Sequence, residues 1–188
     1  MSHRRSLAVL PLALTALSTA QAAFLDGTAV TLRYELGATQ FSDPLTVGAG
    51  TEITCPPPAG AHAVCGALTV PRQTVDFSDT AISYLFTSAT GAPAPFVVDD
   101  PNRFIFDDLD EPGFVLAGAT ISSPLDFTGR LSFDSRSVAL NMSGLTFASG
   151  EGFTIDLTFR DVGQVPVPGT ALLAGLGLAG LALRRRVS

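Results

Sequence analysis

Residues 153–159 read Phe-Thr-Ile-Asp-Leu-Thr-Phe, a strict alternation of apolar and polar side chains. Because successive side chains of a β-strand point to opposite faces of its sheet, this pattern predicts a strand with one buried face. Residues 30–36 repeat the alternation, and shorter versions occur at 82–86, 104–106 and 138–142. No window of the intervening sequence carries the 3.6-residue apolar stripe of an amphipathic helix.

Turn-forming residues separate these segments at short intervals, as in an all-β domain. Four of the turn signals are Gly48-Ala49-Gly50, Gly91-Ala92-Pro93, Asp100-Pro101-Asn102 and Glu111-Pro112-Gly113. The spacing predicts an antiparallel β-sandwich of eight to ten strands, of jelly-roll or Ig-like type, over residues 23–163. We expect the chain's 13 phenylalanines to dominate its core.

Charge is distributed very unevenly along the 188 residues. The chain has 17 acidic residues and 11 basic ones, all arginine, for a net charge of −6. Every acid lies between Asp26 and Asp161, whereas five arginines lie near the chain ends. The six arginines and 17 acids of residues 23–163 leave that part at −11. So acidic a domain is repelled by phosphate backbones, which excludes nucleic-acid binding.

Residues 1–22 have the three parts of a secretory signal peptide. An arginine pair precedes the apolar run 7–17, and Ala20 and Ala22 occupy the small-residue positions of a cleavage site. We expect cleavage after Ala22, with the Sec translocon and signal peptidase as partners. A permanent N-terminal membrane anchor is disfavoured, because the apolar run is too short to span a bilayer.

The two cysteines, Cys55 and Cys65, are ten positions apart. Export to an oxidising compartment favours a disulfide between them. A zinc site lacks ligands, because there is no CxxC spacing and His62 is the only histidine of the body.

The last 25 residues, 164–188, form a segment of different composition. A rigid, extended proline motif comes first, then the uncharged run 170–183, then an arginine cluster. As a helix, the 14-residue run would be about 21 Å long, short of a hydrocarbon core of about 30 Å. The arginines favour the cytoplasmic side, which leaves the body outside. The critical residues are Val165, Pro166, Val167, Pro168, Arg184, Arg185 and Arg186.

This order of proline motif, short hydrophobic helix and arginine cluster resembles the PEP-CTERM sorting signal of bacteria. The usual Pro-Glu-Pro centre is replaced here by Pro166-Val167-Pro168. The resemblance implies transient anchoring in the inner membrane of a Gram-negative bacterium, processing by an exosortase, and transfer to the cell surface or extracellular matrix. It also implies an association with exopolysaccharide and biofilm. The alternative is an ordinary single-pass tail anchor. The sequence from Asn102 onward is similar to the β-rich bodies of such proteins.

An acidic run flanks the segment at 104–106. Clustered loop carboxylates can bind Ca²⁺ in extracellular proteins, so the run is a candidate calcium site, although the EF-hand spacing is absent. The alternative is two solvated hairpin ends that keep the domain soluble. The candidate ligands are Asp99, Asp100, Asp107, Asp108, Asp110 and Glu111.

Catalytic machinery is not evident in the sequence. There is no G-x-S-x-G elbow, and His62 lies in a Pro/Ala/Gly loop where a solvated side chain is expected. We therefore expect a non-enzymatic surface or matrix protein with no catalytic residues and no cofactor other than calcium. Two alternatives are a secreted calcium-dependent or polysaccharide-binding module, and a hydrolase with paired carboxylates.

Overall fold

The computed structural model describes residues 24–56, 62–69 and 72–162. These residues form twelve strands and one short 3₁₀ helix, η1. The strands are β1 (Ala29–Leu36), β2 (Thr39–Thr46), β3 (Ile53–Cys55), β4 (Gln73–Ser78), β5 (Ala81–Phe86), β6 (Ala94–Pro95), β7 (Asn102–Asp107), β8 (Phe114–Ser122), β9 (Leu131–Phe133), β10 (Val138–Asn141), β11 (Thr146–Phe147) and β12 (Gly152–Asp161), and η1 spans Ala63–Gly66.

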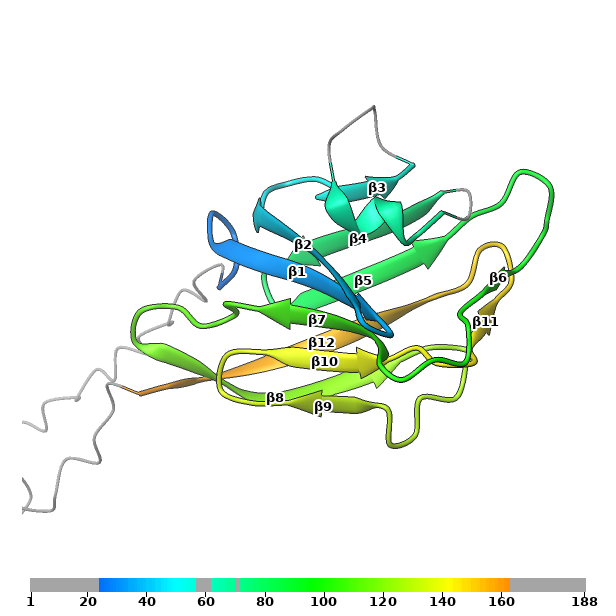
Figure 1. Ribbon diagram of the computed structural model, residues 1–188. Coiled ribbons are helices and arrows are strands. Elements are labelled where there is room, and N and C mark those ends of the chain that lie inside the picture. The colour runs from blue at the N-terminus through cyan, green and yellow to red at the C-terminus, as the bar shows by residue number, and fades with distance from the viewer. Residues whose placement is uncertain (1–23, 57–61, 70–71, 163–188) are drawn as a thin grey trace, which may run out of the picture.

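Two five-stranded sheets make up most of the domain (Figure 1). One has the order β2-β1-β7-β10-β9, the other β3-β4-β5-β12-β8, and β11 pairs with β6 in a small third sheet. All the pairings are antiparallel. The predicted all-β antiparallel class is therefore confirmed. The described residues contain twelve strands rather than eight to ten, because β3, β6, β9 and β11 are only two or three residues long. The jelly-roll or Ig-like type stays a prediction.

Aromatic rings from both large sheets meet in the core. Phe77 of β4 packs edge-on against Phe106 of β7, with ring centroids 5.8 Å apart. Tyr84 of β5 lies 5.7 Å from Phe104 of β7 and stacks on Phe153 of β12 at 5.1 Å. The two sheets thus pack face to face through the apolar residues of the predicted alternations.

The hydroxyl group of each of the two tyrosines donates a hydrogen bond to a buried side-chain amide. Tyr34 donates to Asn102 Oδ1 and Tyr84 donates to Gln73 Oε1, both at 2.6 Å. Asn102 Nδ2 in turn donates to the Val97 carbonyl at 2.7 Å. These bonds satisfy polar groups that would otherwise be costly to bury.

The buried tyrosines predict a loss of stability at high pH. Burial raises the pKa of Tyr34 to about 12 and also raises the pKa of Tyr84. Above pH ~10 the unfolded chain releases tyrosine protons that the folded chain retains, so stability is full below pH ~10 and falls as the pH rises to ~12. We expect a fall of roughly 1.4 kcal/mol per pH unit for each tyrosine.

Urea unfolding from pH 8 to 12 measures this slope. The fall in stability can be assigned to tyrosine because the chain contains no lysine and both cysteines are disulfide-bonded, so neither residue type titrates in this pH range. Tyr84→Phe should halve the slope. A stability that does not change up to pH 12 would contradict the buried state of these hydroxyls.

Candidate functional site

The two ends of the described domain lie together. Phe24 stacks on Phe159 of β12 with ring centroids 5.0 Å apart and meets Phe114 of β8 edge-on at 4.9 Å. Leu25 is fully buried, and the Gly27 N–H donates to the Val47 carbonyl at 2.9 Å. The chain therefore enters the fold at the same end at which β12 leaves it (Figure 1). No sequence pattern predicted this contact, because Phe24 belongs to no alternating segment.

The strand β12 runs directly to the start of the C-terminal segment. Asp161 pairs with Phe114, and the Val162 N–H donates to the Gly113 carbonyl at 2.8 Å. Residue 164 is only two positions beyond Val162. The predicted cleavage residues Ala20 and Ala22, the proline motif 165–168 and the arginine cluster 184–186 lie outside the described residues.

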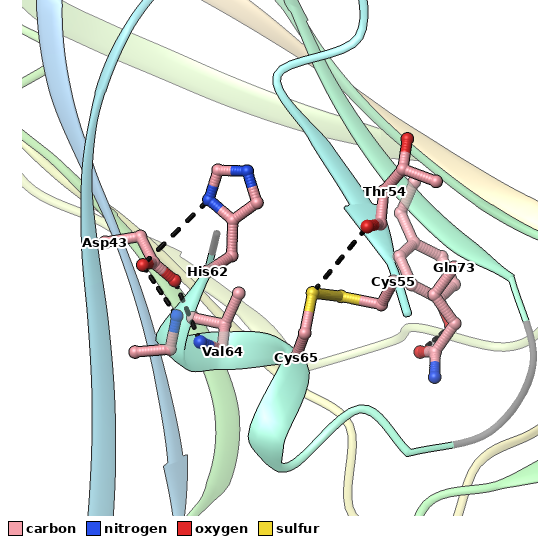
Figure 2. The surroundings of a disulfide bond; sticks show 9 residues. Asp43, Thr54, Cys55, His62, Val64, Cys65 and Gln73 are labelled. Atoms are coloured by element: carbon pink, nitrogen blue, oxygen red, sulfur yellow. Dashed lines mark hydrogen bonds and ion pairs between the residues drawn. A yellow bond between two sulfur atoms is a disulfide. The ribbon is translucent and has the colours of Figure 1, made fainter. Parts of the chain in front are cut away.

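The predicted disulfide is confirmed. Cys55, at the end of β3, is bonded to Cys65 of η1 with their Cα atoms 5.2 Å apart (Figure 2). Cys55 is fully buried, and Cys65 Sγ lies 3.9 Å from the Thr54 carbonyl oxygen. The bond closes a loop of ten residues, a constraint worth about 2–3 kcal/mol in the chain-entropy model.

Asp43 of β2 holds the same loop from the other side. Its two carboxylate oxygens accept hydrogen bonds from the backbone N–H groups of Ala63 and Val64, at 2.7 and 2.8 Å. His62 Nδ1 lies 4.0 Å from Asp43 Oδ1 (Figure 2). The histidine side chain is 22% exposed, so it packs against the loop anchor rather than standing free in solvent as its sequence context predicted. This carboxylate is thus occupied in fixing the loop onto β2.

The acidic run is divided by β7. Asp99 and Asp100 precede the strand and are exposed, whereas Asp107 is its last residue and Asp108, Asp110 and Glu111 follow it. Six residues of antiparallel strand span about 20 Å, so the two groups lie at opposite ends of β7. The two groups look close in the sequence because β7 has only six residues, but those six residues are extended.

The carboxylates at the end of β7 and directly after it contact cations and hydroxyl groups of the domain. Asp107 pairs with Arg33 of β1. Arg136 bridges Asp110 and Asp108, with Nε and Nη2 at 2.9 and 3.1 Å from the respective Oδ1 atoms. The hydrogen bond to Asp110 raises the pKa of Arg136. Two further bonds involve threonine hydroxyls, from Thr31 to Asp108 and from Thr28 to Glu111.

No metal-binding group emerges from this arrangement. Within residues 24–56, 62–69 and 72–162, no three His, Cys, Asp or Glu side chains are grouped so as to hold an ion. Of the predicted calcium ligands, Asp108 and Asp110 meet at Arg136, whereas Asp99 and Asp100 lie at the other end of β7. The calcium site stays a prediction. In the same part of the chain, no helix is long and apolar enough to cross a membrane.

The segment that follows β12 carries a known sequence motif. Residues 164–186 match a family model of a protein-sorting motif. The chain is accordingly an exported protein, anchored transiently at the membrane by its C-terminal segment before processing. The motif is the PEP-CTERM protein-sorting motif, as in PEP-CTERM domain-containing proteins, and it implies processing by an exosortase-type membrane enzyme. No curated protein and no solved structure matches the chain.

Proposed function

We propose that this chain is a non-enzymatic surface or extracellular-matrix protein of a Gram-negative bacterium. The precursor passes through the Sec translocon, loses residues 1–22 to signal peptidase, and is held in the inner membrane by its tail until an exosortase removes it. The β-domain is then displayed outside the cell, in association with exopolysaccharide or biofilm. The sorting motif at residues 164–186 is the observation that carries this proposal.

The short connection between domain and motif supports a precursor whose domain lies close to the membrane before the tail is removed. Val162 is hydrogen-bonded to the domain, and Pro166 lies four residues further along the chain. Four residues span at most about 14 Å. The end of the domain formed by Phe24, Phe114 and Phe159 therefore lies next to the enzyme that processes the motif.

The same end receives the predicted mature N-terminus. Cleavage after Ala22 makes Phe24 the second residue of the mature chain, and its ring packs on the strand that leads into the tail. Both hydrophobic segments of the precursor would then leave from one end of the domain. They can insert side by side, with the arginines of both in the cytoplasm and the domain outside.

Replacing Phe24 tests how firmly the N-terminal segment is held. Phe24→Ala removes ring contacts with Phe159 and Phe114, so we expect a loss of about 1–2 kcal/mol of unfolding free energy for this partly buried side chain. Urea unfolding of the purified protein measures the loss. Phe133→Ala is the matched control because Phe133 is 47% exposed. It should change stability by no more than about 0.5 kcal/mol. Equal effects of the two substitutions on the unfolding free energy would contradict the packing of Phe24 against Phe159 and Phe114.

The sorting step is tested by removing the arginine cluster of the tail and by measuring the mass of the mature chain. Retention of the tail together with an unchanged surface level in every variant would refute the proposal.

A further inference from the structure

One row of side chains crosses the outer face of the sheet β2-β1-β7-β10-β9 and is polar from end to end. The strand register places Gln40 opposite Glu35, Glu35 opposite Arg103, and Arg103 opposite Asn141. The Asn141 N–H then donates to the carbonyl of Arg130 at 2.9 Å, which continues the row past β10. Their apolar neighbours along the strands, such as Tyr34 and Phe104, face the core.

A hollow of about 230 Å³ lies in this row. Arg103, Asn141 and Arg130 line it, together with the small residues Ala139 and Ser132, which are Cα partners in the adjacent row. The short side chains of Ala139 and Ser132 leave space beside Arg103 and Arg130. Two other residues of that second row, Arg33 and Ile105, are large and do not line the hollow.

The arginines at the hollow are fixed in position. Arg103 Nε donates to Glu35 Oε2 at 2.6 Å, and Arg130 Nη1 donates to the Ser143 carbonyl at 2.8 Å. Asp100 also lines the hollow. Together with Glu35 it balances the two arginines, so the formal charge of these four groups is zero. The row offers fixed donors and acceptors without a net charge that would favour an ion.

We propose that this row, defined by Gln40, Glu35, Arg103, Asn141 and Arg130, binds a neutral polysaccharide, with one sugar ring seated in the hollow. Planar guanidinium, carboxylate and amide groups pair with adjacent hydroxyls, which sugars present in arrays. Peptide recognition relies on apolar anchor pockets, whereas six of the ten residues that line the hollow are polar or charged and only Pro101, Leu131 and Ala139 are apolar. Polyanionic chains are disfavoured by the −11 charge of the domain.

The dimensions of the row suit an extended chain. Four of the five residues lie on neighbouring strands and Arg130 directly precedes β9, so the row spans four inter-strand spacings, or about 19 Å, which accommodates several sugar rings across the strands. The row contains no aromatic ring, so binding depends on hydrogen bonds, and we expect a Kd in the range of about 1 mM. Display of many copies on one surface would convert this into firm attachment through avidity. The inference takes its biological setting from the proposed surface display, but binding itself does not depend on sorting.

Calorimetry on the full chain in a detergent without a sugar headgroup tests the inference. The probes are neutral hexasaccharides of glucose, mannose and galactose, with hexagalacturonate as the acidic comparison. We expect at least one neutral hexasaccharide to bind and the uronate to bind more weakly. Absence of heat with all three neutral probes at about 10 mM, tenfold above the expected Kd, would overturn the proposal. Tighter binding of the uronate would overturn it as well.

Variants locate the site. Arg130→Gln removes one charged hydrogen-bonding group at the hollow, which we expect to weaken binding by about tenfold. Arg160→Gln makes the same change on an exposed residue of β12 and should leave binding unaltered. Thermal melts check that both variants fold. Equal affinity of the two variants refutes this site. Loss of sugar binding with normal tail processing refutes this inference alone, whereas abnormal processing with intact binding refutes only the sorting proposal.

Discussion

Replacing Arg184, Arg185 and Arg186 together by alanine is expected to abolish most of the processing of the C-terminal tail. By the positive-inside rule, three positive charges after the apolar run are expected to hold the chain end on the cytoplasmic side of the membrane. Without them the short segment has no strong orientation, and its sorting motif is no longer presented to the exosortase. We expect the mature surface form to fall roughly tenfold or more. Quantitative immunoblots of surface, membrane and medium fractions measure the change.

Lysine at the same three positions is the matched control. The triple Lys variant keeps the charge but loses the guanidinium groups, so it should be oriented like the parent. If the alanine variant reaches the surface with the same mature C-terminus and at the same level as the parent, the sorting role of the cluster is wrong.

Substitution of Gly152 by alanine is expected to have the largest effect on the fold itself. Gly152 begins β12 and pairs with Leu85 of β5. A Cβ atom at this position would overlap the Tyr84 carbonyl oxygen and lie 3.1 Å from the Leu85 Cα atom. Both neighbours are backbone atoms of a central strand, so the clash can be relieved only by moving the sheet. We expect a loss of about 3 kcal/mol or more of unfolding free energy.

Gly118 of β8 provides the comparison, since it also faces β12. A Cβ atom there would meet Thr158 Cβ at 3.5 Å, an ordinary contact. Gly118→Ala should therefore alter stability by no more than about 0.5 kcal/mol in urea unfolding. If Gly152→Ala is as stable as Gly118→Ala, the β5–β12 register is incorrect.

The segments that sequence alone predicted lie in the interior of the sheets. The alternations at 30–36, 104–106 and 138–142 became β1, β7 and β10, which are flanked by strands on both sides. The alternation of apolar and polar residues is weaker in edge strands, because only some of the residues of an edge strand have to be apolar. The strand β2, for example, carries Pro44 and the buried Asp43, so its sequence Thr-Gln-Phe-Ser-Asp-Pro-Leu-Thr shows no regular alternation.

Features that depend on long-range contacts could not be predicted in this way. The cysteine pair was predictable from export and spacing, whereas the anchor of its loop, Asp43, is 20 residues from the N–H group that it binds. The acidic run looked like one cluster in the sequence, but the length of the extended strand β7 separates Asp99 and Asp100 from the other four acids. The stacking of Phe24 on Phe159 joins residues from the two ends of the domain's sequence, and no local pattern encodes such a contact.

The central claim is that both ends of the chain are targeting segments and that the β-domain between them is the displayed protein. Intact-mass analysis of the protein isolated from the cell surface or matrix of its native host tests this most directly. We predict a single chain that begins at Ala23, has the Cys55–Cys65 bond closed, and has lost the apolar run 170–183 together with the arginine cluster. A mass that retains residues 1–22, or that retains the tail through Arg186, would contradict the account.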